Sequence, residues 1–369
     1  MTNRKMRVGI IYGGKSGEHE VSLSTAKAVI GEFDFNKYEI FPIYITKQGE
    51  WRAGPKIVQP IADVEQLKFA AHDSNVLEST QTLSPWGLRS SREHGDGGLD
   101  VLFPLLHGTF GEDGTVQGMM EMLNVPYVGA GVLASAVGMD KVAMKTMFAV
   151  EGLPQCIYRH FTRHQWERNQ AFFIMEIEVS LGYPCFVKPA NLGSSVGISK
   201  ARHREELVAA VQEAFQYDRK VIVEEFVDAR EVEVSVLGND SPRASVVGEI
   251  ASSSEFYDYQ AKYVDGKSIM TIPAQIPAET AEEARSMAVR AYQAIDGSGL
   301  SRVDFFLRRE DGALLINEIN TMPGFTPFSM YPLLWKESGV TYRELIDELL
   351  RLAIERHQEK QGIRYGLGL

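Results

Sequence analysis

The chain has few cysteines and no long hydrophobic run. Its 369 residues include only Cys156 and Cys185, too few for a disulfide framework or a cysteine-rich metal site, and this scarcity suits a reducing compartment. No apolar segment approaches the roughly 18 residues that span a bilayer, and the apolar stretch behind the basic N-terminus is too short for a signal peptide. We therefore expect a cytoplasmic protein without a membrane-inserted segment.

Positive charge is also in short supply. Lysine and arginine number 38 against 49 aspartates and glutamates, so the formal net charge is -11. Such a balance repels polyanions, and nucleic acid is not expected as the principal partner. The hydrophobic share of 44% and the charged share of 24% are ordinary for a globular protein, which excludes a disordered chain. The length predicts two or three domains.

The N-terminal segment lacks the fingerprint G-x-G-x-x-G after its first predicted strand, which argues against a dehydrogenase. Residues 9–16, GIIYGGKS, do match the phosphate-loop pattern G-x-x-x-x-G-K-[ST]. Gly9, however, falls inside the apolar run VGIIY, which predicts a strand. Only residues 13–17 can form a loop before the next helix. We interpret the stretch as a glycine-rich turn between strand and helix, not as a nucleotide site.

Predicted strands and helices alternate over the first 130 or so residues, which indicates a mainly parallel sheet covered by helices. Clusters of Ser, His, Asp and Gly within residues 70–98 are typical of a surface loop. Beyond a helical run over residues 139–150, strand pairs such as SRVDFFL and ALLINEIN follow one another directly. The fold is therefore expected to combine α/β and α+β parts.

The pair SRVDFFL and ALLINEIN carries two opposed carboxylates. A three-residue hairpin loop over residues 310–312, with glycine in the left-handed position, sets Asp304 opposite Glu318. Because side chains alternate between faces, Arg302 and Asn320 share the face of these carboxylates. Hard oxygen ligands at this separation suit Mg²⁺ with substrate phosphates. The alternative is a solvated acidic face on which Arg302 is the partner.

Two further segments could surround a nucleotide. Lys188 ends a predicted strand, and the glycine-serine stretch NLGSSVG follows it, which together could cover a triphosphate. Glu224, Glu225 and Glu231 bracket the end of the next strand and could hydrogen-bond a base and a ribose. An ordinary Gly/Ser turn and a solvated acidic edge are the alternatives.

Three loops have the composition of a substrate site. The loop EFYDYQAKYVDG places four aromatic residues and a lysine among polar ones, as a mobile lid over charged ligands would. His107 follows an apolar run at the C-terminal end of a predicted parallel strand, where open sheets bind ligands, although a lone histidine can be structural. In MPGFTPFS, Gly324 and Ser329 could supply a backbone donor and a hydroxyl.

These motifs occur in an order that resembles the ATP-grasp superfamily and, within it, the D-alanine:D-alanine ligase family. The match runs through EHEVSLSTA, HGTFGEDGTVQG, MDK, FVKPANLGSSVG, EFYDYQAKY, SRVDFFL and NEINTMPGFTPFS. The resemblance implies an N-terminal Rossmann-like domain over residues 1–134, a small central domain over 135–223 and a C-terminal antiparallel-sheet domain over 224–369. It also implies a homodimer, and an ATP- and Mg²⁺-dependent enzyme of peptidoglycan precursor synthesis, with Mn²⁺ as a possible substitute.

The resemblance assigns roles to individual residues. Glu20, His107 and Ser329 would bind the two D-alanine substrates, and Arg302 with the Gly324 N–H would stabilise an oxyanion. Glu20, Ser194 and Tyr263 would form a hydrogen-bonded trio that links the N-terminal loop, the glycine-serine segment and the lid. The ATP contacts would be Lys141, Lys188, Lys262, Glu224 and Glu231. Two Mg²⁺ ions would be held by Asp304, Glu318 and Asn320.

The implied reaction gives a D-alanyl phosphate, which the second amine then attacks. Tyr263 and Ser194 are candidates for removing the amine proton, and the alternative is that they only position substrate. A D-alanine:D-lactate ligase, another carboxylate-amine ligase and a regulatory module that has lost catalysis are the rival interpretations. The tyrosine of AKY favours the dipeptide enzyme, and the intact Arg302 argues against a pure binding module.

Overall fold

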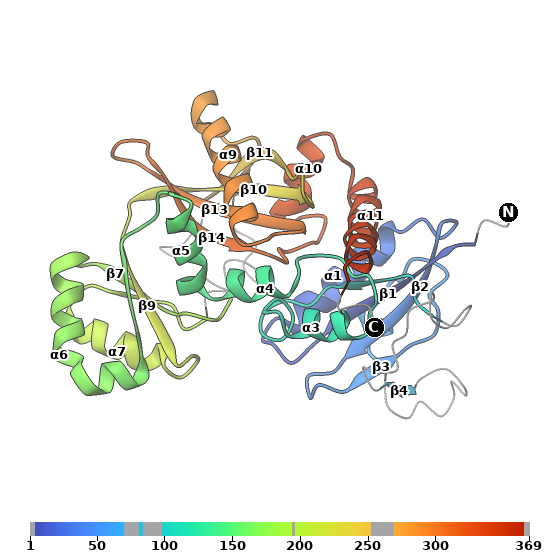
Figure 1. Ribbon diagram of the computed structural model, residues 1–369, viewed down its shortest axis with the longest axis horizontal. Helices are drawn as coiled ribbons and strands as arrows, with labels where there is room; N and C mark the ends of the chain where they lie inside the picture. The colour runs from blue at the N-terminus through green and yellow to red at the C-terminus, as the bar shows by residue number, and fades with distance from the viewer. Residues whose placement is uncertain (1–3, 70–80, 84–97, 194–195, 252–268, 365–369) are drawn as a thin grey trace.

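The computed structural model describes residues 4–69, 81–83, 98–193, 196–251 and 269–364. Within these ranges the strands form three sheets, and Figure 1 shows the small central sheet standing apart from the other two. The predicted combination of a mainly parallel sheet with antiparallel sheets is confirmed.

The N-terminal sheet has the strand order β4-β3-β2-β1-β5. Its members are β1 (Met6–Gly13), β2 (Tyr38–Ile45), β3 (Trp51–Ala53), β4 (Gln81–Leu83) and β5 (Val101–Pro104). Strand β1 is parallel to β2 and β5, whereas β3 and β4 extend the sheet antiparallel. The prediction of a surface loop over residues 70–98 is therefore wrong at β4. Pairing with β3 supplies hydrogen bonds that local composition does not reveal. Most of the predicted loop lies outside the described residues.

Helices of the N-terminal part are α1 (His19–Glu32), the 3₁₀-helix η1 (Val64–Leu67) and α3 (Thr115–Met122). Gly9 lies inside β1, where a Cβ would come within 2.7 Å of the side chains of Leu99 and Leu102. Gly13 and Gly14 then turn the chain with φ angles of 94° and 97°, which L side chains rarely adopt. The phosphate-loop spelling therefore falls on a strand and a turn, as predicted.

Two helices, α4 (Val132–Met139) and α5 (Lys141–Val150), lead to the central part. Asp140 separates them, because its carboxylate accepts hydrogen bonds from the N–H groups of Val142 and Ala143 and so starts a new helix. The central antiparallel sheet has the order β6-β9-β7-β8. Its strands are β6 (Tyr158–Thr162), β7 (Cys185–Pro189), β8 (Ser199–Ala201) and β9 (Lys220–Glu225). Helix α6 (Arg163–Ser180) follows β6, and helix α7 (Arg204–Ala214) follows β8.

Helix α6 was not predicted from the sequence. Its apolar residues cluster in the run FFIM and do not form a helical stripe, so the helix shows no clear periodicity. A reciprocal capping box holds its start: the Thr162 hydroxyl accepts from Gln165 N, and the Gln165 side chain accepts from Thr162 N.

The C-terminal sheet is antiparallel, with the order β12-β11-β10-β13-β14. Its elements are β10 (Ala229–Gly238), β11 (Arg243–Ala251), β12 (Ile269–Thr271), α9 (Ala278–Ala294), β13 (Gly299–Arg308), β14 (Leu314–Asn320), α10 (Met330–Glu337) and α11 (Tyr342–Gln361). Helix α9 packs on one face through Ala284, Ala288 and Ala291, which are buried in the same cluster as the valines of β10.

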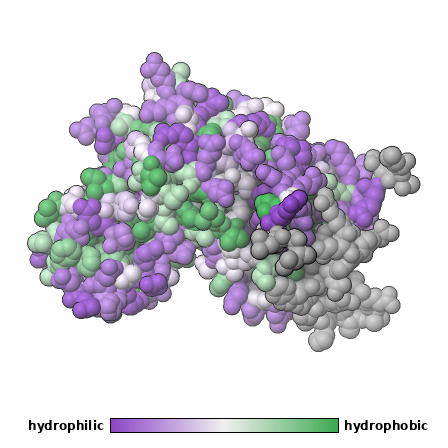
Figure 2. Space-filling view, in the orientation of Figure 1, coloured by the Kyte–Doolittle hydropathy of each residue, from purple (hydrophilic) through white to green (hydrophobic). Residues whose placement is uncertain are grey.

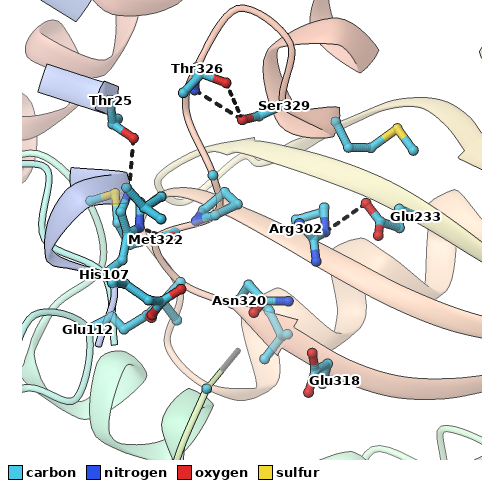
Figure 3. Close-up of a pocket in the computed structure, with 18 of the residues that line it drawn as sticks. Thr25, His107, Glu112, Glu233, Arg302, Glu318, Asn320, Met322, Thr326 and Ser329 are labelled. Carbon is cyan, nitrogen blue, oxygen red and sulfur yellow. Dashed lines mark hydrogen bonds and ion pairs between the residues drawn. The ribbon is translucent and has the colours of Figure 1, made fainter. Parts of the chain in front are cut away.

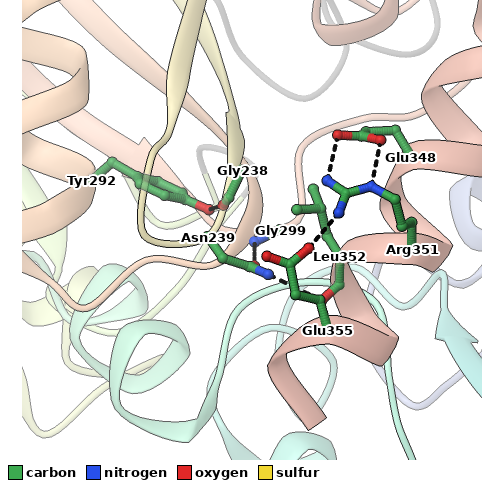
Figure 4. A network of polar contacts seen from close by, with 8 residues as sticks. All are labelled: Gly238, Asn239, Tyr292, Gly299, Glu348, Arg351, Leu352 and Glu355. Atoms are coloured by element: carbon green, nitrogen blue, oxygen red, sulfur yellow. Dashed lines mark hydrogen bonds and ion pairs between the residues drawn. The ribbon is translucent and has the colours of Figure 1, made fainter. Parts of the chain in front are cut away.

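Helix α11 packs the C-terminal part of the chain against the N-terminal sheet. Its Leu345, Leu349 and Leu352 are buried in one cluster with Val8 and Ile10 of β1, and Figure 1 shows α11 beside the N-terminal elements. Asn239 donates to the carbonyl of Leu352 at 3.1 Å and so ties α11 to the turn after β10 (Figure 4). The N- and C-terminal parts therefore share a hydrophobic core.

No helix of the described part is long and apolar enough to cross a membrane. The face in Figure 2 is mostly hydrophilic, with smaller hydrophobic areas. The domain boundaries at residues 134 and 223 stay predictions.

Candidate active site

A cavity of about 510 Å³ opens between the N-terminal part and the C-terminal sheet, beside the segment that follows β7. Its walls come from α1, the loop after β5, the α4–α5 junction, the segment after β7, the β13–β14 hairpin and the loop before α10. Figure 3 shows Arg302, Glu318 and Asn320 on the hairpin, with His107 and Glu112 across the cavity. Among the predicted site residues, the lining includes Glu20, His107, Lys141, Arg302, Glu318, Asn320, Gly324 and Ser329.

The hairpin pairs Asp304 with Glu318 and Arg302 with Asn320, as predicted. The predicted three-residue loop, however, is wrong. Arg308 N donates to the carbonyl of Ala313, so one additional residue lies in the loop. A register shift between Asp304 and Phe305 places an extra residue in β14 and restores the predicted pairing.

Arg302 lies between two acidic side chains. Its guanidinium donates to both oxygens of Asp304 at 2.7 and 2.6 Å, and its Nε lies 2.9 Å from Glu233 Oε2. Burial opposes the charged form, but Asp304 and Glu233 raise the pKa of Arg302 well above its ordinary value. The guanidinium of Arg302 therefore presents a fixed positive charge to the cavity from strand β13. Glu233 was not identified from the sequence.

The donors at this hairpin fit a hard divalent cation. They comprise two carboxylates at paired positions and the amide oxygen of Asn320, whose Nδ2 donates to Asp304 at 3.0 Å. Mg²⁺ accepts one or two carboxylates and completes its shell with water and phosphate oxygens. Within the described ranges no group of three or more His, Cys, Asp or Glu side chains gathers for a metal ion, so an ion held by protein alone is not indicated there.

Glu224 is buried between two lysines and not at a solvated acidic edge. Lys188 Nζ donates to its Oε2 at 2.5 Å, and Lys145 Nζ lies 3.2 Å from its Oε1. The side chains of Lys145 and Glu224 are only 1% and 3% exposed. Burial would raise the pKa of Glu224, but the two ammonium groups lower it to about 2. Burial likewise disfavours the charged form of Lys188, yet Glu224 raises its pKa above the ordinary value.

Lys141 is the first residue of α5, and its Nζ donates to the carbonyl of Leu192 at 2.7 Å. This contact joins α5 to the glycine-serine stretch. Glu231 lies on β10, paired with Ile250 of β11 and Phe306 of β13, and its side chain is exposed.

His107 is buried, with Nδ1 3.3 Å from the carbonyl of Met322 and Nε2 3.3 Å from the hydroxyl of Thr25. Burial lowers its pKa, against the opposing charge of Glu18. Glu112 accepts a hydrogen bond from Gly108 N at 2.6 Å. Burial and the neighbouring Glu18 charge raise the pKa of Glu112 to about 8. Acidic groups thus crowd the wall opposite the hairpin.

Two glutamates at the start of α1 have different surroundings. Glu20 is 55% exposed and forms ion pairs with Lys47 at 2.8 Å and Lys68 at 3.5 Å. The Lys47 contact lowers the pKa of Glu20. Glu18 is only 7% exposed, and a Cβ on Gly108 would come within 2.7 Å of its Oε2. The buried carboxylate on this wall is therefore Glu18.

Ser329 precedes the first turn of α10, and its hydroxyl lies 2.8 Å from Thr326 Oγ1 and accepts from Thr326 N at 3.1 Å. A Cβ on Gly324 would be 3.1 Å from that hydroxyl. The loop between β14 and α10 therefore presents a hydroxyl and a helix N-terminus, both suited to an anion.

The lid residues Lys262 and Tyr263, and Ser194 of the glycine-serine stretch, lie outside the described residues. Sequence reasoning missed Glu18, Glu112, Lys145 and Glu233. Lys145 could have been suspected because it lies one helical turn beyond Lys141, on the same side of a helix. Nothing in the local pattern distinguished Glu18 from Glu20.

Two family models match the chain. The one described as D-ala D-ala ligase N-terminus covers residues 7–130, and the one described as D-ala D-ala ligase C-terminus covers residues 147–351. The D-alanine–D-alanine ligase of Bacillus licheniformis is 57% identical over 366 residues, which are 98% of this chain and 99% of that protein. The ligase of the same name from Listeria monocytogenes is 51% identical over 368 residues, with 98% and 99% covered.

Solved structures agree. The VanG D-Ala:D-Ser ligase from Enterococcus faecalis superposes with a TM-score of 0.81 at 36% identity, covering 95% of this chain and 100% of that one. The D-alanine–D-alanine ligase from Coxiella burnetii gives a TM-score of 0.79 at 34% identity, covering 97% and 96%. The ATP-grasp architecture is thereby confirmed. Over nearly its whole length, the chain belongs to the D-alanine–D-alanine ligase family.

Proposed function

We propose that this protein joins two D-alanine molecules into D-alanyl-D-alanine, with ATP converted to ADP and phosphate, for peptidoglycan precursor synthesis. The observation that carries the proposal is that Glu318, Asn320, Arg302 and the N-terminus of α10 line one cavity together with Glu18 and His107. A carboxylate and an amide for a cation, a fixed cation for an oxyanion and an anion site lie within one space.

ATP would lie with its phosphates between the hairpin and the central sheet. Lys141 and Lys188 supply cationic charge there, with Lys262 of the lid as a third candidate, and Glu224 and Glu231 are proposed for the adenine and ribose region. Asp304, Glu318 and Asn320 would hold two Mg²⁺ ions, for which Mn²⁺ could substitute. Bound cations would neutralise phosphate charge and polarise the γ-phosphoryl group.

In the first step the carboxylate of one D-alanine attacks the γ-phosphorus, the bond to the bridging oxygen breaks, and ADP leaves. Two anions must meet in this step, so cationic side chains are required near the phosphates. Lys188 fits this role because Glu224 keeps it protonated.

In the second step the amine of the other D-alanine attacks the acyl phosphate. A C–N bond forms and negative charge develops on the carbonyl oxygen. The C–O bond to phosphate then breaks, and the departing phosphate takes up the proton that the nitrogen loses. Arg302 and the Gly324 N–H are proposed to stabilise that oxygen, which is the usual task of preorganised donors. Asp304 and Glu233 hold the guanidinium in place through contacts of 2.6 and 2.9 Å.

The first D-alanine carries an ammonium, and we assign it to Glu18 in place of Glu20. Glu18 is the buried carboxylate beside His107, whereas Glu20 is already paired with Lys47. The carboxylate of the second D-alanine would bind at Ser329 and the N-terminus of α10. Ser194 and the lid residue Tyr263 remain proposed hydrogen-bond partners of the Glu18 carboxylate.

Glu18→Gln is expected to raise the KM for D-alanine by about 30-fold or more, because losing one partner of a buried charge pair costs about 2 kcal/mol or more. Glu20→Gln should change that KM by about threefold at most, since exposed ion pairs contribute little. Steady-state kinetics at varied D-alanine and saturating ATP separate the two. A larger effect at Glu20 would restore Glu20 as the ammonium ligand.

The ligase activity itself is tested by phosphate release from ATP with D-alanine, D-lactate, D-serine or L-alanine. We expect release that depends on D-alanine and a dipeptide product detectable by mass spectrometry. Release only when D-lactate or D-serine is added as the second substrate would reassign the enzyme. We further infer a homodimer and a cytoplasmic location, which analytical ultracentrifugation and cell fractionation would test.

A further inference from the structure

A second cavity, of about 240 Å³, lies at the carboxyl-terminal edge of the N-terminal sheet. It is enclosed by the turn after β1, the β2–β3 hairpin, the loop after β5 and helix α3. In open parallel sheets this edge is where ligands bind. Lys15 and Ser16, which completed the phosphate-loop spelling, lie on its wall and are not used by the proposed ligase chemistry.

The lining is apolar except at the rim. Ile45, Leu106 and Val116 are buried at the floor, and Trp51 and Met119 are partly exposed beside them. An apolar cavity of about 150 Å³ already holds benzene. A space of about 240 Å³ therefore suits a ligand with two fused rings.

Phe110 at the rim has an unusual backbone. Its φ is 66°, and its ring is 51% exposed. A bulky residue in the left-handed region is strained, and such strain is most often kept at functional sites. Here the conformation is held by a hydrogen bond from Phe110 N to Asp113 Oδ2 at 2.8 Å.

Lys15 gives this rim a positive charge. Its Nζ lies 5.8 Å from the centre of the Phe110 ring, and no carboxylate of the described residues pairs with it within 4.0 Å. An apolar body with one anionic group complements such a surface.

The two cavities share a wall. His107 lines both, and the Ser16 hydroxyl donates to the His107 carbonyl at 2.6 Å. We propose that the smaller cavity is a second binding site, which takes a small aromatic carboxylate and changes the affinity of the first D-alanine site through His107. Only the coupling rests on the proposed function.

Binding is tested with 6-fluoro-2-naphthoate by ¹⁹F NMR titration of the full chain. We expect saturable binding, about fivefold weaker in Lys15→Gln because a partly exposed ion pair contributes up to about 1 kcal/mol. It should be lost in Thr115→Trp, which fills the cavity from an exposed position of α3. Lys336→Gln, with the same change in net charge at another exposed site, should bind as the wild type does.

Equal binding to Thr115→Trp, or no saturable binding to the wild type, would refute the site. If 2-fluoronaphthalene binds as tightly as the acid and Lys15→Gln has no effect, the ligand class is wrong. For the coupling, the probe should change the KM for D-alanine at least twofold in the wild type and leave it unchanged in Thr115→Trp. Confirmed binding with unchanged KM would overturn the coupling alone, and absence of any ligase activity would instead count against the proposed function.

Discussion

Replacing Glu318 by glutamine is expected to lower kcat by about 10³-fold or more, while the protein stays folded. The substitution keeps the shape of the side chain but removes one of the two opposed carboxylates that would hold the divalent cation. Lewis-acid stabilisation by a bound metal is worth several kcal/mol, and each 1.36 kcal/mol corresponds to a factor of ten in rate. Phosphate release at saturating ATP and D-alanine measures the loss.

The fold should not suffer, because Glu318 is partly exposed on the cavity floor and the substitution removes repulsion between two carboxylates. Glu310→Gln provides the matched control, since Glu310 is exposed in the loop of the same hairpin. We expect that control to retain wild-type activity. If Glu318→Gln kept full activity over a Mg²⁺ titration, the cation would have to be placed elsewhere.

Lys145→Met is expected to destabilise the protein by about 1–3 kcal/mol, since it leaves the buried Oε1 of Glu224 without its cationic partner. Glu224, whose side chain is 3% exposed, would then be balanced by Lys188 alone, whose side chain is 12% exposed. Urea unfolding followed by circular dichroism measures the loss. Lys336→Met, at an exposed position, should have little effect.

The companion variant Lys145→Met/Glu224→Gln should be less stable than Lys145→Met, because it leaves the largely buried Lys188 without its carboxylate partner. A double variant as stable as Lys145→Met would show that the Glu224 charge does not compensate Lys188. In Lys145→Met, Lys188 would be the only cation that pairs with Glu224, so less of its charge would be available to the phosphates. We therefore also expect a raised KM for ATP in the folded protein.

The group of Lys145, Lys188 and Glu224 also predicts how stability depends on pH. Glu224 has a pKa of about 2 against an ordinary value of 4.5, so its ion pairs stabilise the folded state above pH 4.5. That contribution is lost as the pH falls from 4.5 towards 2. Without Lys145 the carboxyl is less strongly held in its charged form, so acid unfolding should begin at a higher pH. Unchanged acid unfolding would contradict the charge assignment.

Some site geometry follows from local rules. Side-chain alternation along two neighbouring strands was enough to pair Asp304 with Glu318, although the loop is one residue longer than predicted and a bulge makes up the difference. Gly9 could be recognised as part of a strand because it interrupts a continuous apolar run. Such features depend on near neighbours in the chain, and near neighbours are visible in the sequence.

Other features depend on contacts between distant segments. Glu18 and Glu20 look alike in the sequence, but only the packing of the loop after β5 over the start of α1 buries the first and leaves the second beside Lys47. Lys145 becomes part of the site because β9 brings Glu224 to α5. Strand β4 exists because β3 offers it hydrogen bonds.

By itself, the sequence determined the family, the N-terminal alternation of strands and helices, the antiparallel strands that follow, and the hairpin whose carboxylates face each other. Each of these follows from the order of motifs or from local periodicity. The tertiary structure decided which of two adjacent glutamates is buried, how two lysines share one carboxylate, and that Lys15 borders a separate cavity. Burial and ion pairing arise from segments far apart in the chain, so no local pattern could specify them.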